Sequence, residues 1–191
     1  MKISPRGSAF LPRVLVVHPA MVPYRVDLFN SLHDLLPLRV LFVQPLPGYD
    51  ANLDRRDLQE AFRCDHALLR EHASPALGSL ARRMWGEAGR YRPDVLVTHE
   101  FSQASTLAAV IARFRGRQLR HVVWTTKNPL EIAASRGLRL MVARGLARAA
   151  DAVMTYSAES ADRLASLAHV ARERFFVCAN HQDPDRLRIS A

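Results

Sequence analysis

Short, continuously apolar runs recur along this chain, and segments with the apolar spacing of a helix separate them. A run that is apolar throughout, rather than at alternate positions, is typical of a parallel strand buried on both faces. The expected strands are RVLVVH (13–18), LRVLFVQ (38–44), FRCDHALL (62–69, the weakest), DVLVTH (94–99), HVVWTT (121–126), DAVMTYS (151–157) and RFFVCAN (174–180).

Helices are expected between these strands. Their ranges are about 24–36, 76–91, 103–115, 130–149 and, for AESADRLASLA, 158–168. Strands that alternate with helices form a parallel sheet, and right-handed crossovers place helices on its two faces. We therefore predict an α/β, Rossmann-like doubly wound parallel sheet of about seven strands in a single domain over 13–182, after a tail at 1–12.

Ligands of such folds bind beyond the carboxyl ends of the strands. The loop after the first strand, in HPAMVPYRVDLFNSL (18–32), contains no glycine. It cannot offer the close backbone approach to a pyrophosphate that the G-x-G-x-x-G loop provides. The sequence therefore predicts recognition through side chains at this edge. Polar residues expected there are His18, Thr98, His99, Glu100, Thr125, Thr126, Lys127, Tyr156, Ser157 and Asn180.

The chain is strongly basic, with a formal net charge of +9 over 191 residues. Nine basic residues and one acidic residue fall between Arg113 and Arg148. This balance favours nucleic acid, anionic lipid or a phosphorylated ligand as partner. The two cysteines form no disulfide framework, which fits a reducing cytosol. No segment approaches the roughly 20 apolar residues that span a bilayer.

The segment RGLARAADAVMTYSAESADRLASLAHVARERFFVCANHQDPDRL (144–187) resembles the end of the N-terminal domain of family-4 glycosyltransferases of the GT-B fold. VPYRVDLFNSL (22–32) is similar to that family's first loop and helix, and RPDVLVTH (92–99) to its central strand. The resemblance covers about residues 13 to 187. The sequence departs from the family at Asn180-His181-Gln182-Asp183, where a glycine is missing.

This resemblance implies the acceptor-binding half of an enzyme that transfers a sugar from a nucleotide-sugar, with retention of configuration, to a lipid-linked or saccharide acceptor. The nucleotide-sugar is then expected to bind a C-terminal domain or partner chain, with 183–191 as the start of a linker. The glutamate pair eight positions apart that marks that domain does not occur in these residues. No cofactor and no metal are expected, and the isolated chain is not expected to turn over.

Candidate site residues follow from the strand ends. His99 and Glu100 are predicted to act in catalysis, because a histidine can relay a proton and a neighbouring carboxylate can orient it. The alternative is that either residue caps the next helix. Substrate binding is predicted for His18, Tyr24, Arg25, Thr126, Lys127 and Ser157. The alternatives are a satisfied buried histidine at 18, a helix-surface arginine at 25, a solvated loop at 127 and a helix cap at Ser157.

The helix at 136–149 is predicted to place Leu138, Val142, Gly145, Leu146 and Ala149 against the core. Apolar residues among arginines on its other side are typical of a helix lying on an anionic membrane. The predicted membrane surface consists of Arg136, Leu140, Met141, Arg144 and Arg148. A solvated basic face is the alternative. We expect the protein in the cytoplasm or bound peripherally to the inner face of the plasma membrane.

A rival function is a non-enzymatic Rossmann-like module that binds nucleic acid or a phosphorylated ligand through its basic face. No RNA-binding signature or aromatic stacking platform is apparent, so nucleic acid is not the expected partner. Cys64, Asp65 and His66, with His72 nearby, do not have the spacing of a zinc site.

Overall fold

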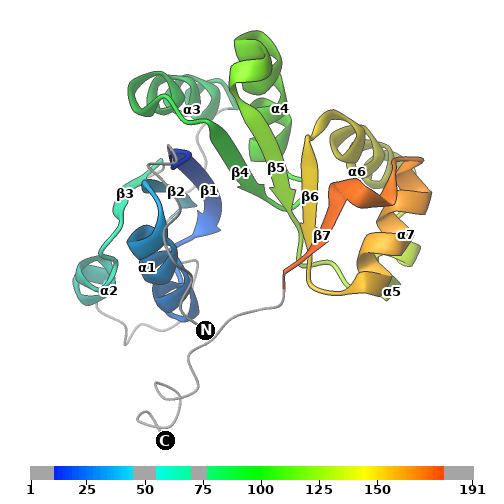
Figure 1. Ribbon diagram of the computed structural model, residues 1–191, viewed down its shortest axis with the longest axis horizontal. Coiled ribbons are helices and arrows are strands. Elements are labelled where there is room, and N and C mark those ends of the chain that lie inside the picture. The colour runs from blue at the N-terminus through cyan, green and yellow to red at the C-terminus, as the bar shows by residue number, and fades with distance from the viewer. Residues whose placement is uncertain (1–10, 45–54, 70–76, 179–191) are drawn as a thin grey trace, which may run out of the picture.

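The computed structural model describes residues 11–44, 55–69 and 77–178. Its centre is one seven-stranded sheet in the order β3-β2-β1-β4-β5-β6-β7, and every neighbouring pair is parallel (Figure 1). The strands are β1 (Val14–Ala20), β2 (Leu38–Gln44), β3 (Asp65–Leu68), β4 (Val95–His99), β5 (Arg120–Trp124), β6 (Ala152–Thr155) and β7 (Phe175–Val177). The predicted Rossmann-like fold of seven parallel strands is confirmed.

Helices cover the sheet in two layers. They are α1 (Val26–Leu35), α2 (Arg55–Ala61), α3 (Leu77–Tyr91), α4 (Gln103–Arg115), α5 (Pro129–Ala134), α6 (Gly137–Ala149) and α7 (Ala158–Ala168). Short 3-10 turns lie at η1 (Pro23–Arg25), η2 (Gly116–Gln118) and η3 (Arg172–Arg174).

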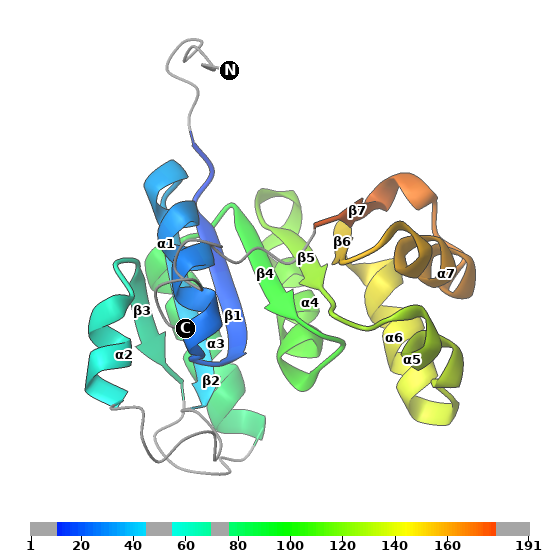
Figure 2. The same cartoon turned by 90° about the horizontal axis from the view of Figure 1, so that it is seen from below.

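The core follows the alternation of side chains along the strands. On one face, Phe29 of α1, Leu58 of α2 and Phe62, just after α2, pack with Val40 and Phe42. On the opposite face, α3 and α4 cover the centre of the sheet, and α5, α6 and α7 cover β5 to β7. The arrowheads of β2, β3 and β4 in Figure 2 point the same way, so the carboxyl ends of the strands share one edge.

Several boundaries differ from the sequence-based predictions. The single helix expected over 130–149 is two helices, because the backbone leaves the helical region at Ser135 and Arg136 and Gly137 has a φ of +56°. The helix α2 was not predicted. It follows residues 45–54, which fall outside the described residues. The strands predicted at 62–69 and 174–180 are shorter, since β3 begins at Asp65 and β7 ends at Val177.

The face that α6 turns to the core also differs from the prediction. Its buried residues are Ala143, Leu146 and Ala147, whereas Leu138 has 74% of its surface exposed. Gly137 starts the helix in a phase that turns Leu138 outward. Among the described helices, none combines the length and hydropathy needed to cross a bilayer.

Candidate functional site

Strand order reverses between β1 and β4, and the candidate site lies at this point. β1 continues to β2 on one side and pairs with β4 on the other. Loops from the two strands diverge there, because α1 covers one face of the sheet and α4 the other. Ligands of open α/β sheets bind in the crevice that such a divergence leaves.

His18 and His99 lie side by side at this crevice, with ring centroids 4.9 Å apart. His18 is almost fully buried, and its Nδ1 donates to the carbonyl oxygen of Ala20 at 2.7 Å. The ring of His18 also meets Phe29 edge-on at 5.7 Å. This matches the satisfied, buried histidine that the sequence analysis gave as one alternative for residue 18. His99 is half-buried, and its Nδ1 is buried with no hydrogen-bond partner among the described residues.

Arg25 joins these histidines from the turn η1 and is also buried. Its guanidinium donates to the hydroxyl of Tyr156, at the end of β6. It also lies over the indole of Trp124, 4.5 Å from the ring centroid, and over Tyr24 at 5.1 Å. Trp124 in turn meets His99 edge-on at 5.5 Å. We call His18, Arg25, His99, Trp124 and Tyr156 the edge cluster.

Burial and neighbouring basic groups keep both histidines of the edge cluster neutral. Burial is the main reason that the pKa of His99 falls to about 4, and the charge of Arg25 adds to it. For His18, burial and then the neighbouring His99 lower the pKa to about 3. At neutral pH, His99 therefore offers an uncharged nitrogen that can accept or donate one hydrogen bond. Its imidazole is therefore a weak base and carries no positive charge at neutral pH.

Glu100, the other predicted catalytic residue, ties β4 to the loop after β5. Its carboxylate accepts from the hydroxyls of Thr125 and Thr126, at 2.8 and 2.5 Å, and from the backbone N–H of Thr126 at 2.7 Å. Its φ of +58° lies in the left-handed region, which costs energy for a residue with a side chain. Three hydrogen bonds to one carboxylate hold it there. The cap of α4 is Ser102, so Glu100 does not take the capping role given as an alternative.

Lys127 and Ser157 lie together at the beginning of α7, apart from the contacts of the edge cluster. Ser157 caps α7 by accepting from the N–H of Ser160, which is the alternative considered for it. The hydroxyl of Ser160 donates to the carbonyl oxygen of Lys127 at 3.1 Å. The ammonium of Lys127 lies 6.0 Å from the ring centroid of Phe101. Asn180, also expected at this edge, lies outside the described residues.

A cavity of about 430 Å³ opens beside the edge cluster, at the beginning of α4. His99, Glu100, Ser102 and Gln103 contribute polar groups to its lining, and Val17 and Leu80 lie among its apolar walls. A helix N-terminus carries partial positive charge and free N–H donors. The cavity therefore suits a polar ligand with oxygen acceptors.

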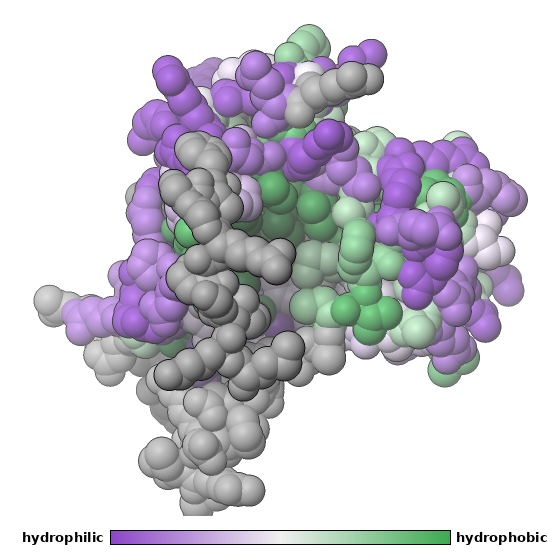
Figure 3. All heavy atoms as spheres, in the orientation of Figure 1, coloured by the Kyte–Doolittle hydropathy of each residue, from purple (hydrophilic) through white to green (hydrophobic). Residues whose placement is uncertain are grey.

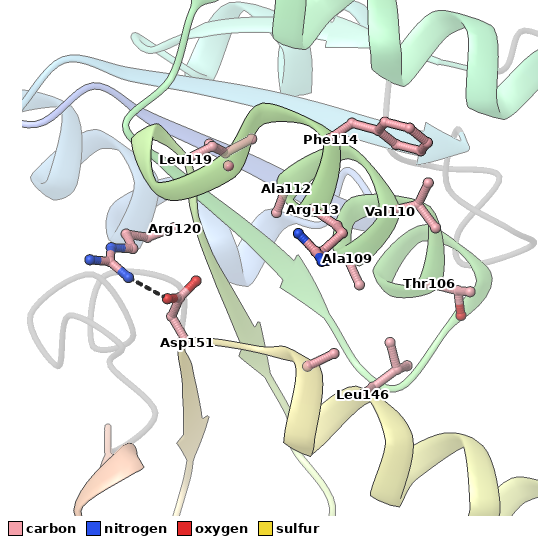
Figure 4. Close-up of a pocket in the computed structure, with 12 residues that line it drawn as sticks. Thr106, Ala109, Val110, Ala112, Arg113, Phe114, Leu119, Arg120, Leu146 and Asp151 are labelled. Atoms are coloured by element: carbon pink, nitrogen blue, oxygen red, sulfur yellow. Dashed lines mark hydrogen bonds and ion pairs between the residues drawn. The ribbon is translucent and has the colours of Figure 1, made fainter.

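A second cavity, of about 700 Å³, lies between α4 and α6 near the opposite edge of the sheet (Figure 4). Arg113 lies on its wall, and Arg120 is ion-paired with Asp151 at 2.7 Å. None of the predicted site residues lines this cavity. Its location at the amino ends of β5 and β6 separates it from the edge cluster.

The predicted membrane surface is only partly exposed. Arg136 and Met141 are exposed, whereas Leu140 and Arg144 are half-buried. Arg148 donates from Nε to the carbonyl oxygen of Ala168, at the end of α7, so it also has a structural role. The exposed apolar side chains in this region are Leu130, Leu138 and Met141, at 79%, 74% and 68% exposure.

Sequence reasoning did not identify Trp124 as part of the site. It lies within the run HVVWTT, which was predicted as a strand without a site role for the tryptophan. Its register opposite His99 and Met154 brings it to the edge. A tryptophan two residues before the end of the run HVVWTT is the signal that could have identified it.

Comparison with known proteins agrees with this architecture. The sequence model of the glycosyl transferase 4-like domain matches residues 12–181. No protein of curated function matches the sequence.

Solved structures share the fold at low sequence identity. Anabaena Alr3699/HepE, in complex with UDP and glucose, is 17% identical with a TM-score of 0.64, and the alignment covers 94% of this chain and 50% of that one. UDP-N-acetylglucosamine 2-epimerase from Rickettsia bellii is 13% identical with a TM-score of 0.61, covering 90% and 45%. The Neisseria meningitidis UDP-GlcNAc 2-epimerase bound to UDP-GlcNAc is 14% identical with a TM-score of 0.56, covering 88% and 46%. The chain thus spans about half the length of these structures.

Proposed function

Because this chain belongs to the family of glycosyl transferase 4-like domains, we propose that it is the acceptor-binding half of a GT-B glycosyltransferase. In this proposal the complete enzyme moves a sugar from a nucleotide-sugar to a saccharide or lipid-linked acceptor. The nucleotide-sugar binds on polypeptide outside these residues. The structures of HepE with UDP and glucose, and of the epimerases with UDP-GlcNAc, support a nucleotide-sugar as the second substrate.

The observation that carries the proposal is the convergence of the edge cluster at the strand-order reversal. An acceptor hydroxyl needs a polar, preorganised group beside it. His99 offers a buried Nδ1 without a partner among the described residues, beside the cavity at the start of α4. We assign His99 to hydrogen bonding with the acceptor hydroxyl. A neutral imidazole can accept that proton when the sugar bond forms.

The other predicted residues have distinct roles in this proposal. Arg25 and Tyr156 hold the wall of the site through their mutual contact. Burial, with a smaller contribution from the charge of Arg25, keeps His99 neutral. Glu100 is a positioning residue that fixes Thr125 and Thr126. Lys127 lies at the beginning of α7, where it faces an acceptor or donor phosphate in the assembled enzyme.

A lipid-linked acceptor would lie in a bilayer, and an exposed basic and apolar surface could bind that bilayer. Leu130, Leu138 and Met141 are exposed beside Arg136 and Arg139, and we call these five residues the basic apolar surface. Four residues separate the end of β5 from the start of α5, and α6 leads back to the start of β6. The surface therefore lies toward the same edge as the site. Apolar side chains among arginines bind anionic bilayers by burial and by charge.

The test is acceptor binding by the isolated chain. Saturation-transfer NMR with a panel of free saccharides and polyprenyl-phosphate-linked sugars should identify a binder, and UDP should give no transfer. His99→Ala should abolish the signal, and His33→Ala, which changes an exposed histidine of α1, should leave it intact. Binding of UDP without any saccharide would assign this half to the donor and overturn the proposal.

A further inference from the structure

The proposed sugar transfer makes no use of the cavity between α4 and α6. Its volume of about 700 Å³ lies within the range of about 300–1,000 Å³ that is usual for small-molecule sites. The cavity lies at the amino ends of β5 and β6, and the edge cluster lies at the opposite edge of the sheet. Leu119 and Leu146, which belong to its lining, are almost fully buried. The molecule therefore has a second cavity of small-molecule size.

Small side chains keep this cavity open. Ala109 and Ala112 line it from α4, and Ala149 lines it from α6. An alanine reaches only one carbon beyond the backbone, so these residues cannot fill the space between the two helices. Val110 and Phe114 of α4 also line the cavity, and they are 46% and 77% exposed. Water thus contacts apolar carbon at the cavity, which favours a ligand with an apolar body.

One unpaired positive charge belongs to the same lining. Arg113 is exposed and has no hydrogen bond or ion pair with any residue that the structure describes. Figure 4 shows its side chain projecting from α4 on the side of the cavity. The charges of Arg120 and Asp151 compensate each other in an ion pair of 2.7 Å. The guanidinium of Arg113 is therefore available for a carboxylate or a phosphate, which it can hold through two parallel hydrogen bonds.

We propose that the cavity between α4 and α6 binds a free amphipathic anion. A single apolar chain lies against the alanines of the two helices, and a carboxylate or phosphate head binds Arg113. The basic apolar surface lies toward the other edge of the sheet, so this ligand enters from solution and not from a bound bilayer. The inference goes beyond the proposed sugar transfer and does not depend on it.

Trp85 can report binding in this cavity. Its ring, on α3, meets the ring of Phe114 edge-on, with centroids 6.0 Å apart. Bromine quenches indole fluorescence only at short range, so a brominated chain beside Phe114 should quench Trp85. The probes are ω-bromododecanoate and ω-bromododecyl phosphate, kept below the concentrations at which they form micelles. At least one of them should quench in a saturable way and bind at least about tenfold more tightly than the uncharged ω-bromododecanol.

Variants of the lining separate the contributions of charge and space. Arg113→Gln should weaken the binding of the anion at least about tenfold and leave the alcohol unchanged, whereas Arg113→Lys should keep most of the binding. Ala149→Phe should weaken both probes, because a larger side chain fills the cavity. Ala149 is exposed on α6, so this change does not disturb the core. Arg82→Gln, at an exposed arginine of α3 outside the lining, is the matched control and should bind as the parent does.

Two controls locate the bound chain. Trp85→Phe should abolish the quenching, because the remaining tryptophan, Trp124, belongs to the edge cluster at the opposite edge. Figure 3 shows a further apolar region in the middle of the molecule, where the strands lie. Phe176→Asp, at a residue of β7 that is 56% exposed, tests adsorption to exposed strand residues and should leave binding unchanged.

Four results would overturn the proposal. They are the absence of saturable quenching by either anion, equal binding of the anions and the alcohol, unchanged binding by Arg113→Gln, and quenching that persists in Trp85→Phe. Sedimentation of the chain alone as a dimer that Phe114→Asp dissociates would also overturn it, because a second copy would then cover the cavity.

Discussion

The guanidinium of Arg25 lies over the indole of Trp124, with Cζ 4.5 Å from the ring centroid. The contact joins the turn after β1 to the end of β5, although 99 positions separate the two residues. Two strand ends on either side of β4 are thereby held against His99. Through this contact and its hydrogen bond to Tyr156, Arg25 links the ends of β1, β5 and β6.

Removing the charge of Arg25 should raise the pKa of His99 from about 4 toward its ordinary value. The rise should be partial, because burial lowers this pKa more than Arg25 does. NMR titration of the His99 ring in Arg25→Gln measures the effect. Arg25→Lys keeps the charge and loses the planar stack, so the pKa of His99 should stay low there. An unchanged His99 pKa in Arg25→Gln would show that the charge of Arg25 does not affect His99.

Replacing Glu100 should destabilise the fold while leaving the sheet intact. Glu100→Ala leaves Thr125, Thr126 and one backbone N–H without their acceptor, at a cost of about 1–3 kcal/mol. Urea denaturation of the free chain measures this change in the free energy of unfolding. Glu159→Ala, at a carboxylate that is 70% exposed and pairs weakly with Arg163, is the matched control and should cost less than 1 kcal/mol. An equal loss of unfolding free energy in the two variants would mean that Glu100 does not tie β4 to the loop after β5.

Stability should fall as the pH falls from about 6.5 to 4. Burial lowers the pKa of His121 to about 4, as it does for His99, and lowers that of His18 to about 3. In this window the unfolded chain binds protons that the folded chain excludes, so protonation favours unfolding. Each histidine can contribute on the order of 3 kcal/mol.

The check is urea denaturation of the chain at several pH values. His121→Asn should flatten the pH dependence, and the exposed His33→Gln should leave it unchanged. A stability that is constant between pH 7 and pH 4 would contradict the burial of these rings.

The sheet and its functional edge were predictable because burial on both faces leaves a continuous apolar run in each strand. RVLVVH and DVLVTH have the pattern of buried parallel strands, and His18 and His99 are their last residues. The crossover rules then place both histidines at one edge. What the sequence could not supply is the strand order, which makes β1 and β4 neighbours and brings Trp124 beside His99.

Local backbone conformation explains why the helix predicted over 130–149 is two helices. A continuous helix was expected over 130–149. Asn128 and Glu131 form a capping box at the start of α5, the backbone becomes extended at Ser135 and Arg136, and α6 begins at Gly137. The new start rotates α6, so Leu138 faces outward and Ala143 inward. The break at Ser135 to Gly137 thus changed which apolar residues meet the core and which form the basic apolar surface.

Binding to anionic vesicles should depend on Leu138 and Met141. Both are exposed and beside Arg136 and Arg139, so they can enter the headgroup region while the arginines meet lipid phosphates. Burying a side chain of this size contributes about 1.5–3 kcal/mol. Replacing both by serine should therefore lower partitioning onto phosphatidylglycerol vesicles by at least about tenfold, with little change in the free energy of unfolding.

Co-sedimentation with phosphatidylglycerol and phosphatidylcholine vesicles checks this prediction. Leu35→Ser is the matched control, because Leu35 is 69% exposed on α1, away from the basic apolar surface, and its loss should leave binding unchanged. Arg139→Ser should weaken binding at low salt and matter less at high salt, since salt screens exposed charges. If the double variant binds phosphatidylglycerol as the parent does, the lipid-linked acceptor loses its main structural support. The proposal would then narrow to saccharide acceptors.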